Sequence, residues 1–566
     1  MLRTLAVTFC LIVPFFQASA QVDTLTLLHV NDTHSMLAPT GPRTTSQQGT
    51  RGGIARAATI IGSTKMADRN VLLLHAGDFS MGDLFYNLYF GAAELRLLSH
   101  LGFDAIAVGN HEFDLMPSTL RWALDSGFVE GGCPLLSANL VLDDPAVQSL
   151  RSFIRPSTIK DFGTFRVGIF GILTPETNVL SQPSPAIVDT NFVAVARSVV
   201  DTLRSRDCSV IVCLSHLGVV DDERLASAVP GINVIVGGHD HNLYTQPRVV
   251  ARNVEDTTWI VQANSAYLDI GKLKLTLSGG HVRVVDYHVI PLDLRVSEEP
   301  VVADKVKGLI SQIEGRYGPL YTRQIAYSKG YFNEVADSLM SPGHKDTPIG
   351  NLVTDAFRGL TGTQIAMEVG GSTAQPLYPG PIVAADAFRV VGYGFNKDNG
   401  LGYHLATFSL LGADLLKGLE YGLSAIEARD EFLVQVSGLR YSYNSSQPPF
   451  ARLVDVVVGK SPVDPAAKYS VTSNEFVPLF LKSLGIPCEN LDVFGGDTTE
   501  FQVLAHYISV LDTIRPKIDG RIVNVVALDG KAQPGPAPHR YDLNQVRPYP
   551  AREDLLTDIT SAARKP

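Results

Sequence analysis

The segment that decides the fold is LTLLHVNDTH, residues 25–34. Its aliphatic half predicts a buried strand over residues 25–30. Its polar half places a carboxylate and an imidazole, Asp32 and His34, two residues apart just beyond that strand. Both side chains can point at one metal ion there, and a polar turn without an ion is the alternative. The metal interpretation gains weight because the chain repeats the pattern.

Aliphatic or β-branched runs of the same kind alternate with helical patterns as far as about residue 294. They predict further strands over residues 71–75, 105–108, 166–172, 210–214 and 233–236. This alternation is typical of an α/β fold with layered sheets. Ligands of open α/β sheets collect beyond the carboxyl ends of the strands. We therefore expect the polar residues that follow these runs to converge on one edge.

Metal-capable residues follow four of these predicted strands. Asp78 has two carboxylate oxygens and can bridge two cations, and the amide oxygen of Asn110 can bind a cation without adding charge. Three imidazoles follow later strands, at His216, His239 and His241. A structural role is the alternative for any one of these histidines. Five such blocks in this order argue against coincidence.

His111 and Asp114 form a second kind of pattern within the block after residue 108. His111 is next to Asn110 and can point towards a substrate as a proton donor. Asp114 lies three residues further on and can orient the imidazole and raise its basicity. The alternative is that both residues cap a helix. With the metal pattern beside them, we interpret them as a catalytic dyad.

These segments resemble the calcineurin-like metallophosphoesterases, and more closely the secreted 5′-nucleotidase and UDP-sugar hydrolase family. The resemblance covers about residues 22–526 and implies a layered β-sandwich-type domain flanked by helices, followed by a second mixed α/β domain. The matching motifs are Asp32-x-His34, Gly52-Gly53-Ile54-Ala55-Arg56, Gly77-Asp78, Gly109-Asn110-His111-Glu112, Ser215-His216, Gly238-His239-x-His241 and Gly350-Asn351-Leu352-Val353-Thr354-Asp355-Ala356.

The resemblance also implies two divalent metal ions and assigns their ligands. One ion would be held by Asp32, His34, Asp78 and His241, and the other by Asp78, Asn110, His216 and His239. His111 and Asp114 would form the catalytic dyad. Relatives often have an amide residue at the position of His241. The imidazole-rich set here is compatible with zinc, manganese or iron.

The 566 residues divide into five expected regions. Residues 1–20 have the charge, apolar run and small residues of a secretory signal, which predicts cleavage after Ala20 and a secreted or periplasmic protein. A membrane anchor is the alternative, but the apolar run is too short to span a bilayer. The other regions are a metallophosphoesterase domain (21–295), a helical connector (296–321), a 5′-nucleotidase-type substrate domain (322–526) and a Pro-rich tail (527–566).

Charge and cysteine content restrict the partners of the chain. A net charge of -10 without a Lys/Arg block argues against binding of nucleic acid polymers. After residue 20 no apolar run approaches the length of a transmembrane segment. Four cysteines remain beyond the predicted signal. Cys208 and Cys213 flank a predicted strand, which would hold them too far apart to pair with each other.

The second half of the chain departs from the resembled family where that family binds the nucleoside. Relatives use paired aromatic side chains and arginines there, but segment 369–374 has no arginine. Arg389 and Arg440 are candidate replacements, and a surface position is the alternative for each. The candidate substrate-binding residues are Asn396, Phe432, Phe476, Phe494 and Asp497. For each aromatic ring the alternative is a place in the core.

The expected function is that of an exported dinuclear-metal phosphoester hydrolase. Attack of a metal-activated hydroxide would release phosphate, with nucleoside 5′-monophosphates as the leading substrates. Nucleotide sugars and 2′,3′-cyclic nucleotides are the next candidates. The alternative of a different class is a metal-containing surface binding protein without catalysis. The dyad of His111 and Asp114 argues against that alternative.

Overall fold

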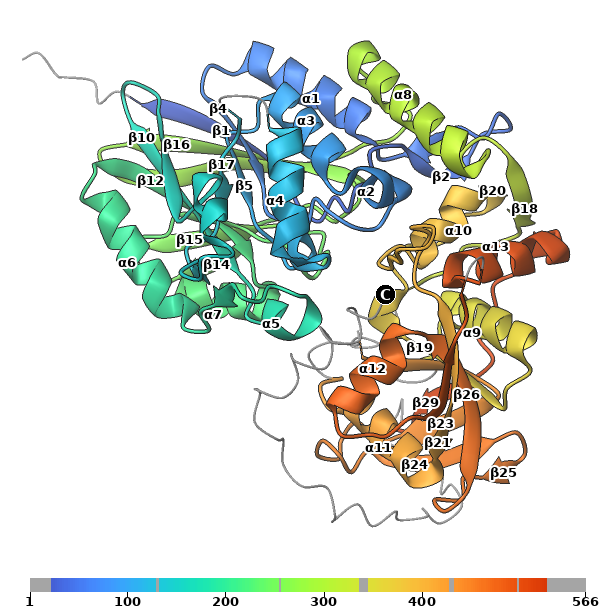
Figure 1. Ribbon diagram of the computed structural model, residues 1–566. Coiled ribbons are helices and arrows are strands. Elements are labelled where there is room, and N and C mark those ends of the chain that lie inside the picture. Colours follow the sequence, from blue (N-terminus) through green and yellow to red (C-terminus); the bar gives the residue numbers. More distant parts are fainter. Residues whose placement is uncertain are drawn as a thin grey trace, which may run out of the picture.

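The computed structural model describes residues 22–128, 132–253, 256–334, 345–426, 432–495 and 498–526. The predicted signal sequence and Pro-rich tail lie outside these residues. The described chain forms two lobes (Figure 1). The first lobe contains the elements up to β17 (His281–Pro291), and the second contains those from β18 (Gln324–Ser328) onwards. Helix α8 (Pro300–Tyr317) connects them.

Two sheets pack face to face in the first lobe. In spatial order, the seven-stranded sheet contains β17, β16 (Asp269–Ser278), β1 (Asp23–Val30), β4 (Val71–His75), β5 (Ala105–Ala107), β6 (Leu135–Leu136) and β8 (Ile154–Arg155). The six-stranded sheet contains β14 (Arg248–Ala251), β15 (Thr257–Val261), β13 (Val234–Val236), β12 (Cys208–His216), β10 (Arg166–Leu173) and β9 (Ser157–Asp161). The expected strands are therefore confirmed, with ends that differ by a few residues.

The alternation of side chains explains this layered arrangement. In β1, Leu25 and Leu27 face the core between the two sheets, while Leu28 and Val30 face the helices outside. Successive side chains of a strand point to opposite faces, so each sheet buries apolar residues on both sides. The outer faces are covered by α1 (Ile54–Ala67), α3 (Ala92–Leu101) and α4 (Met116–Gly127) on one sheet, and by α6 (Phe192–Arg204) and α7 (Val219–Ala228) on the other.

Short elements complete the first lobe. They are β2 (Thr40–Arg43), β3 (Gly49–Arg51), α2 (Leu84–Tyr89), η1 (His111–Phe113), β7 (Leu140–Val141), η2 (Gln148–Ser152), α5 (Thr177–Leu180) and β11 (Ile187–Val188). Cys208 and Cys213 both lie within β12, and the four described cysteines are free thiols. The expectation that these two do not pair is confirmed.

The second lobe is mixed α/β, as expected. Its five-stranded sheet contains β22 (Val434–Ser437), β19 (Ile365–Val369), β26 (Lys468–Asn474), β21 (Leu405–Leu411) and β27 (Glu489–Val493). A three-stranded sheet contains β20 (Gly380–Val383), β18 and β28 (Thr513–Ile514). A four-stranded sheet contains β25 (Ser461–Pro462), β24 (Leu453–Val458), β23 (Leu439–Tyr443) and β29 (Ile522–Asn524). The helical elements are α9 (Pro348–Thr361), η3 (Gly370–Ser372), α10 (Ala384–Val390), α11 (Gly412–Leu423), α12 (Phe476–Ser483) and α13 (Glu500–Leu511).

The two lobes share buried contacts. Phe85 of the first lobe and Phe388 of the second belong to one continuous apolar cluster. Arg43 donates hydrogen bonds to Asp386 across the boundary, at 2.5 and 2.6 Å. Figure 1 shows α10 and β20 beside β2 at this junction. The arrangement of the lobes is therefore supported by both apolar and charged contacts.

The structure excludes a surface position for Arg389. A surface position was the alternative for this arginine, but its side chain is only 1% exposed and is paired with Asp83 of the first lobe. Arg440 is exposed. Among the described residues, no helix combines the length and apolar character needed to cross a membrane.

Candidate active site

The candidate site residues lie beyond the carboxyl ends of parallel strands. β1, β4 and β5 run parallel in one sheet, and β12 and β13 run parallel in the other. Asp32 follows β1 and Asp78 follows β4, while His216 is the last residue of β12. The two sheets therefore bring their polar ends to a common edge, as the sequence predicts.

The backbone at this edge is unusual. φ is positive at Asp32 (47°), His34 (47°), Asp78 (54°), His239 (82°) and His241 (55°). Residues other than glycine rarely adopt this backbone conformation. It costs roughly 1–3 kcal/mol per residue and persists only where the surroundings impose it. Such strain is found where a loop is held in a functional conformation.

The first group of candidate metal ligands consists of Asp32, His34 and His241, whose donor atoms lie within 4.8 Å of one another. The Nε2 atoms of His34 and His241 are 3.0 Å apart, and Nε2 of His241 is 3.7 Å from Oδ1 of Asp32. Asp32 also accepts hydrogen bonds from the backbone N–H of His239, at 2.9 and 3.1 Å. These contacts hold one carboxylate and two imidazoles around a common point.

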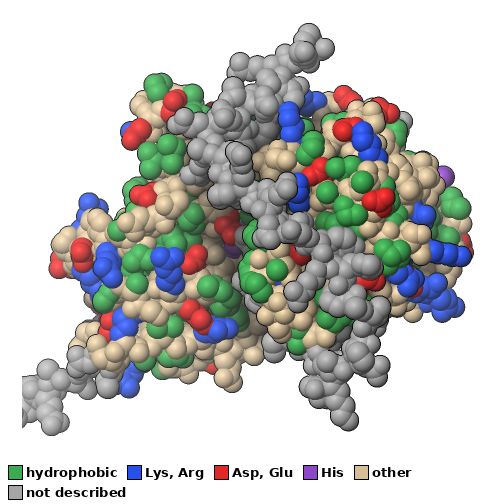
Figure 2. All heavy atoms as spheres, turned by 90° about the horizontal axis from the view of Figure 1, so that it is seen from below, with side chains coloured by type: hydrophobic (Ala, Val, Ile, Leu, Met, Phe, Trp, Pro, Cys, Tyr) green, Lys and Arg blue, Asp and Glu red, His purple; other side chains and the backbone are tan. Residues whose placement is uncertain are grey.

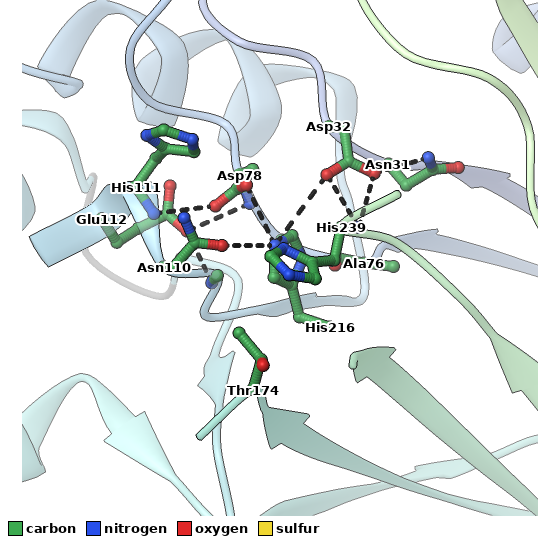
Figure 3. A network of polar contacts seen from close by, with 12 residues as sticks. Asn31, Asp32, Ala76, Asp78, Asn110, His111, Glu112, Thr174, His216 and His239 are labelled. Carbon is green, nitrogen blue, oxygen red and sulfur yellow. Dashed lines mark hydrogen bonds and ion pairs between the residues drawn. The ribbon is translucent and has the colours of Figure 1, made fainter. Parts of the chain in front are cut away.

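The second group consists of Asp78, His216 and His239. Nε2 of His216 lies 2.9 Å from Oδ2 of Asp78 and 3.2 Å from Oδ1 of Asn110. Contacts from Asp32, Asp78 and Asn110 converge on this imidazole (Figure 3). Its Nδ1 atom donates to the carbonyl of Ala76 at 2.8 Å, which leaves Nε2 as the atom that faces the group.

Asp78 is the residue that joins the groups. It also belongs to a third group with His34 and His111. Gly109 permits this crowding, because a Cβ there would lie 2.2 Å from Oδ1 of Asp78. Asp78 therefore lies between the donor atoms of His216 and His239 and that of His34, with His111 beside it.

The donor set fits divalent metal ions. Imidazole nitrogens and carboxylate oxygens are the usual ligands of zinc, manganese and iron. Burial raises the pKa of Asp78, but the neighbouring imidazoles of His216 and His111 lower it more, to well below its ordinary value. Burial lowers the pKa of His34 well below its ordinary value. An ionised carboxylate and a neutral imidazole are the forms that bind a metal.

His111 and Asp114 are in direct contact. Nδ1 of His111 lies 2.5 Å from Oδ2 of Asp114, and Ser181 donates to the other carboxylate oxygen at 2.7 Å. Burial lowers the pKa of His111, but the charges of Asp114 and Asp78 raise it more, to about 9. A histidine held in this way is protonated at neutral pH and can donate a proton from Nε2.

Two residues that support the site have no role predicted from the sequence. The Glu112 carboxylate is 2% exposed and accepts hydrogen bonds from the backbone N–H groups of Gly109, Asp78 and Ser80, at 2.6, 3.1 and 3.1 Å. Glu112 thereby joins the loops after β4 and β5. The feature of the sequence that could have indicated this role is the position of Glu112 directly after His111, inside the motif Gly109-Asn110-His111-Glu112.

Glu176 is the second such residue. Its Oε2 atom lies 3.1 Å from Nε2 of His239. That contact leaves Nδ1 of His239 as the nitrogen that can face a metal. Carboxylates commonly orient metal-binding imidazoles in this way. No local pattern marked Glu176, which lies far from His239 in the sequence.

Comparison with known proteins agrees with this geometry. Residues 25–243 match the family model described as calcineurin-like phosphoesterase, and residues 325–481 match that of the 5′-nucleotidase C-terminal domain. The 5′-nucleotidase of Homo sapiens is 28% identical over 539 residues, which cover 88% of this chain and 90% of that protein. The 5′-nucleotidase of Diplobatis ommata is 26% identical over 537 residues, with the same coverage.

A solved structure supports the same relationship over both lobes. It is the 5′-nucleotidase precursor from Thermus thermophilus, with 28% identity and a TM-score of 0.78, covering 89% of this chain and 100% of that one. The chain belongs to the 5′-nucleotidase family. It is a metal-dependent phosphoester hydrolase.

In this 5′-nucleotidase family member, two of the candidate substrate residues belong to a row of aromatic rings in the second lobe. The ring of Phe476 stacks against those of Tyr403 and Phe480, and Phe432 stacks against the other side of the row at Phe480. Phe476 is 37% exposed. Burial raises the pKa of the Tyr403 hydroxyl, and the charge of Asp114 adds to this shift.

The other three candidates are placed differently. Phe494 is partly buried and packs against the large apolar cluster. Asn396 is 5% exposed, and its side-chain amide makes hydrogen bonds with Asn399 and Gly402 inside its own loop. Asp497 lies outside the described residues.

Proposed function

We propose that this family member hydrolyses nucleoside 5′-monophosphates to nucleosides and phosphate. The observation that carries the proposal is the contact of His111 with Asp114 at the edge of two candidate metal groups. A structural metal site needs no proton donor beside it, whereas phosphoester cleavage needs both. The nucleotide substrate is inferred from relatives named 5′-nucleotidase.

The proposed site holds two divalent ions. The first would be bound by Asp32, His34, Asp78 and His241, and the second by Asp78, Asn110, His216 and His239. When bound, such ions lower the pKa of a water molecule and neutralise charge on phosphoryl oxygens. Zinc, manganese and iron all suit this imidazole-rich donor set.

His111 would donate a proton to the leaving oxygen of the substrate. Its Nδ1 atom is held by Asp114, so Nε2 is the atom available to the substrate. Asp114 keeps the ring in one orientation and stabilises its protonated form. Ser181 in turn fixes the Asp114 carboxylate by donating to Oδ1. The three side chains together hold and deliver one proton.

The second lobe would bind the nucleoside. Phe476 has a partly exposed ring in the aromatic row and is the strongest candidate for stacking on a base. A role in substrate binding remains a prediction for Phe432, Phe494, Asn396 and Asp497.

The domain limits proposed from the sequence are 21–295, 296–321 and 322–526. Red and purple side chains, Asp or Glu and His, are visible where the two lobes meet (Figure 2).

Export is also proposed, with cleavage after Ala20. The residues concerned lie outside the described part of the chain. N-terminal sequencing of protein secreted from cells that express the full chain tests it. A mature protein that begins at Gln21 is expected, and one that still begins at Met1 would contradict export through this signal.

A substrate panel tests the proposed reaction. Purified protein loaded with manganese or zinc is incubated with AMP, a UDP-sugar, a 2′,3′-cyclic nucleotide and p-nitrophenyl phosphate, and phosphate release is measured. The highest kcat/KM is expected for AMP. A preference for the UDP-sugar or the cyclic nucleotide would change the substrate, and no turnover with metals bound would indicate a binding protein.

A further inference from the structure

The second lobe places a tyrosine on the catalytic dyad. The ring of Tyr393 stacks on that of His111, with centroids 4.7 Å apart and planes inclined by 22°. It also contacts His34, with centroids 5.3 Å apart. His111 and His34 belong to the first lobe, so the site as described is built by both lobes. Neither the motifs of the resembled family nor the local sequence predicts a role for Tyr393.

The loop that carries Tyr393 is docked on the first lobe. The backbone N–H of Gly82 donates to the carbonyl of Gly392 at 3.1 Å. A Cβ at Gly392 would lie 2.4 Å from the carbonyl oxygen of Gly82, so only glycine permits this approach. Asn87 donates to the carbonyl of Gly394 at 3.1 Å. The residues on both sides of Tyr393 are therefore fixed against the segment that follows Asp78.

More distant contacts reinforce this docking. Asn87 also donates to the carbonyl of Gly400 at 2.7 Å, and the hydroxyl of Tyr317 donates to the carbonyl of Asn399 at 2.9 Å. The ring of Phe395 packs edge to face on that of Phe90, with centroids 5.5 Å apart. The loop thus has several anchors on the first lobe and one on the connecting helix α8, and Tyr393 is held in place with it.

The contact with Tyr393 completes the orientation of His111. Asp114 fixes the Nδ1 atom at one edge of the imidazole, but a single hydrogen bond leaves the tilt of the ring undefined. Tyr393 covers a face of the ring, and His34 meets it at 79°. These three contacts together define the direction in which Nε2 points. A small error in that direction slows proton transfer strongly.

We propose that Tyr393 is a positioning residue, supplied by the second lobe, that orients His111 for protonation of the leaving group. This inference rests on the proposed function, because it assumes that His111 is the proton donor. The aromatic ring carries the effect, since it is the ring that stacks on His111. Docking of the second lobe would then be needed for cleavage of esters with poor leaving groups.

Two substrates with different leaving groups test the proposal. The alkoxide that leaves AMP needs a proton, whereas p-nitrophenolate is a stable anion and leaves without one. The variants Tyr393→Phe, Tyr393→Leu and Tyr393→Ser are compared with the parent protein. Tyr327→Leu is the matched control, because Tyr327 is 39% exposed on β18 of the same lobe. Metal content and the melting temperature are measured for each variant. Of Tyr393→Leu and Tyr393→Ser, the variant that keeps the melting temperature of the parent protein is used for the kinetic comparison.

The expected result is a split between the substrates. Loss of the ring should lower kcat for AMP by about 10-fold or more and kcat for p-nitrophenyl phosphate by less than about 3-fold. KM and metal content should remain close to the parent values. Tyr393→Phe should keep most of the activity on both substrates, and the control should be unchanged.

Other outcomes would overturn the inference. An equal loss on both substrates, or a loss of metal, would mean that Tyr393 acts on the metal site or on folding. An unchanged kcat for AMP would mean that the stacking has no role in catalysis. If the parent protein releases no phosphate from either ester, the proposed function itself fails, and that result is distinguishable from the others.

Discussion

Arg389 and Asp83 form an ion pair that is buried on both sides, with side chains 1% and 0% exposed and Nη2 2.6 Å from Oδ2. One partner belongs to each lobe. Removing one partner of a buried pair leaves the other charge without compensation, at a cost of about 3–5 kcal/mol. We expect Arg389→Met to lower the free energy of unfolding by that amount, measured by urea denaturation.

Arg440→Met is the control for this prediction, because Arg440 is an exposed arginine of the same lobe. It should change stability by less than about 0.5 kcal/mol. Combining Arg389→Met with Asp83→Asn should recover part of the loss, since no unpaired charge then remains. Equal stability of Arg389→Met and the parent protein would show that the pair does not stabilise the docked lobes.

His111→Ala should separate catalysis from metal binding. Loss of a general acid typically slows turnover by roughly 10²–10⁴-fold. The two candidate groups that do not include His111 remain complete in this variant. The amount of bound metal, measured by elemental analysis, should therefore equal that of the parent protein. Asp114→Asn should have a smaller effect in the same direction. A variant that loses metal together with activity would instead identify His111 as a ligand.

Asp78→Ala should empty both metal positions. The carboxylate lies near the donor atoms of His216 and His239 and, in another candidate group, near that of His34, so its removal takes a ligand from both proposed ions. Elemental analysis of the purified variant should find less than about half of the parent metal content per protein chain. Asp286→Ala is the control, because this aspartate is 52% exposed on β17. Full retention of two ions would refute the shared role.

Glu176→Ala should weaken the second metal position selectively. The carboxylate lies 3.1 Å from Nε2 of His239 and orients the imidazole that would bind the ion through Nδ1. Loss of such a partner lowers metal affinity by roughly 10–100-fold. Titration with a competing chromogenic chelator measures the change. Glu223→Ala, at a partly exposed glutamate of the same lobe, should leave affinity unchanged.

Glu368 makes the stability of the second lobe depend on pH. This carboxylate is fully buried and shares the side-chain amide of Asn474 with Glu500. Burial raises the pKa of Glu368 from 4.5 to about 7. The folded state therefore holds a proton more tightly than the unfolded state, and the stabilisation is complete below about pH 4.5 and is lost as the pH rises through about 7.

Glu368→Gln removes this titration, so we expect it to flatten the decline in stability between pH 5 and pH 8. At pH 8 the variant should be more stable than the parent by about 1–3 kcal/mol, and the difference should shrink below pH 5. Thermal unfolding across this range measures both effects. Glu489→Gln, at an exposed glutamate, is the control. A difference between Glu368→Gln and the parent that does not change with pH would contradict the assignment.

Most of the candidate site was predictable from the sequence because its signals are local. Asp32, Asp78 and His216 each end or follow a short apolar run, and parallel strands bring their ends to one edge. The contact of His111 with Asp114 likewise spans three residues. Helix α8 lies within the connector predicted over residues 296–321.

The substrate side was harder to predict because its residues depend on distant neighbours. Phe432 and Phe476 are recognisable as aromatic residues, but their place in a row with Phe480 and Tyr403 depends on where the fold brings α12 relative to Phe432 and Tyr403. Asn396 is a polar residue in a glycine-rich loop, and only the fold shows that its amide bonds within that loop.

The sequence by itself determined the reaction class and the edge at which its residues gather, because strand alternation and the residues beyond each strand act over a few positions. Only the tertiary structure decided what the second lobe contributes. Arg389 meets Asp83 across 306 positions of sequence, and Tyr393 reaches His111 from the other lobe. Such contacts depend on how two separately formed surfaces dock, and no local pattern encodes them.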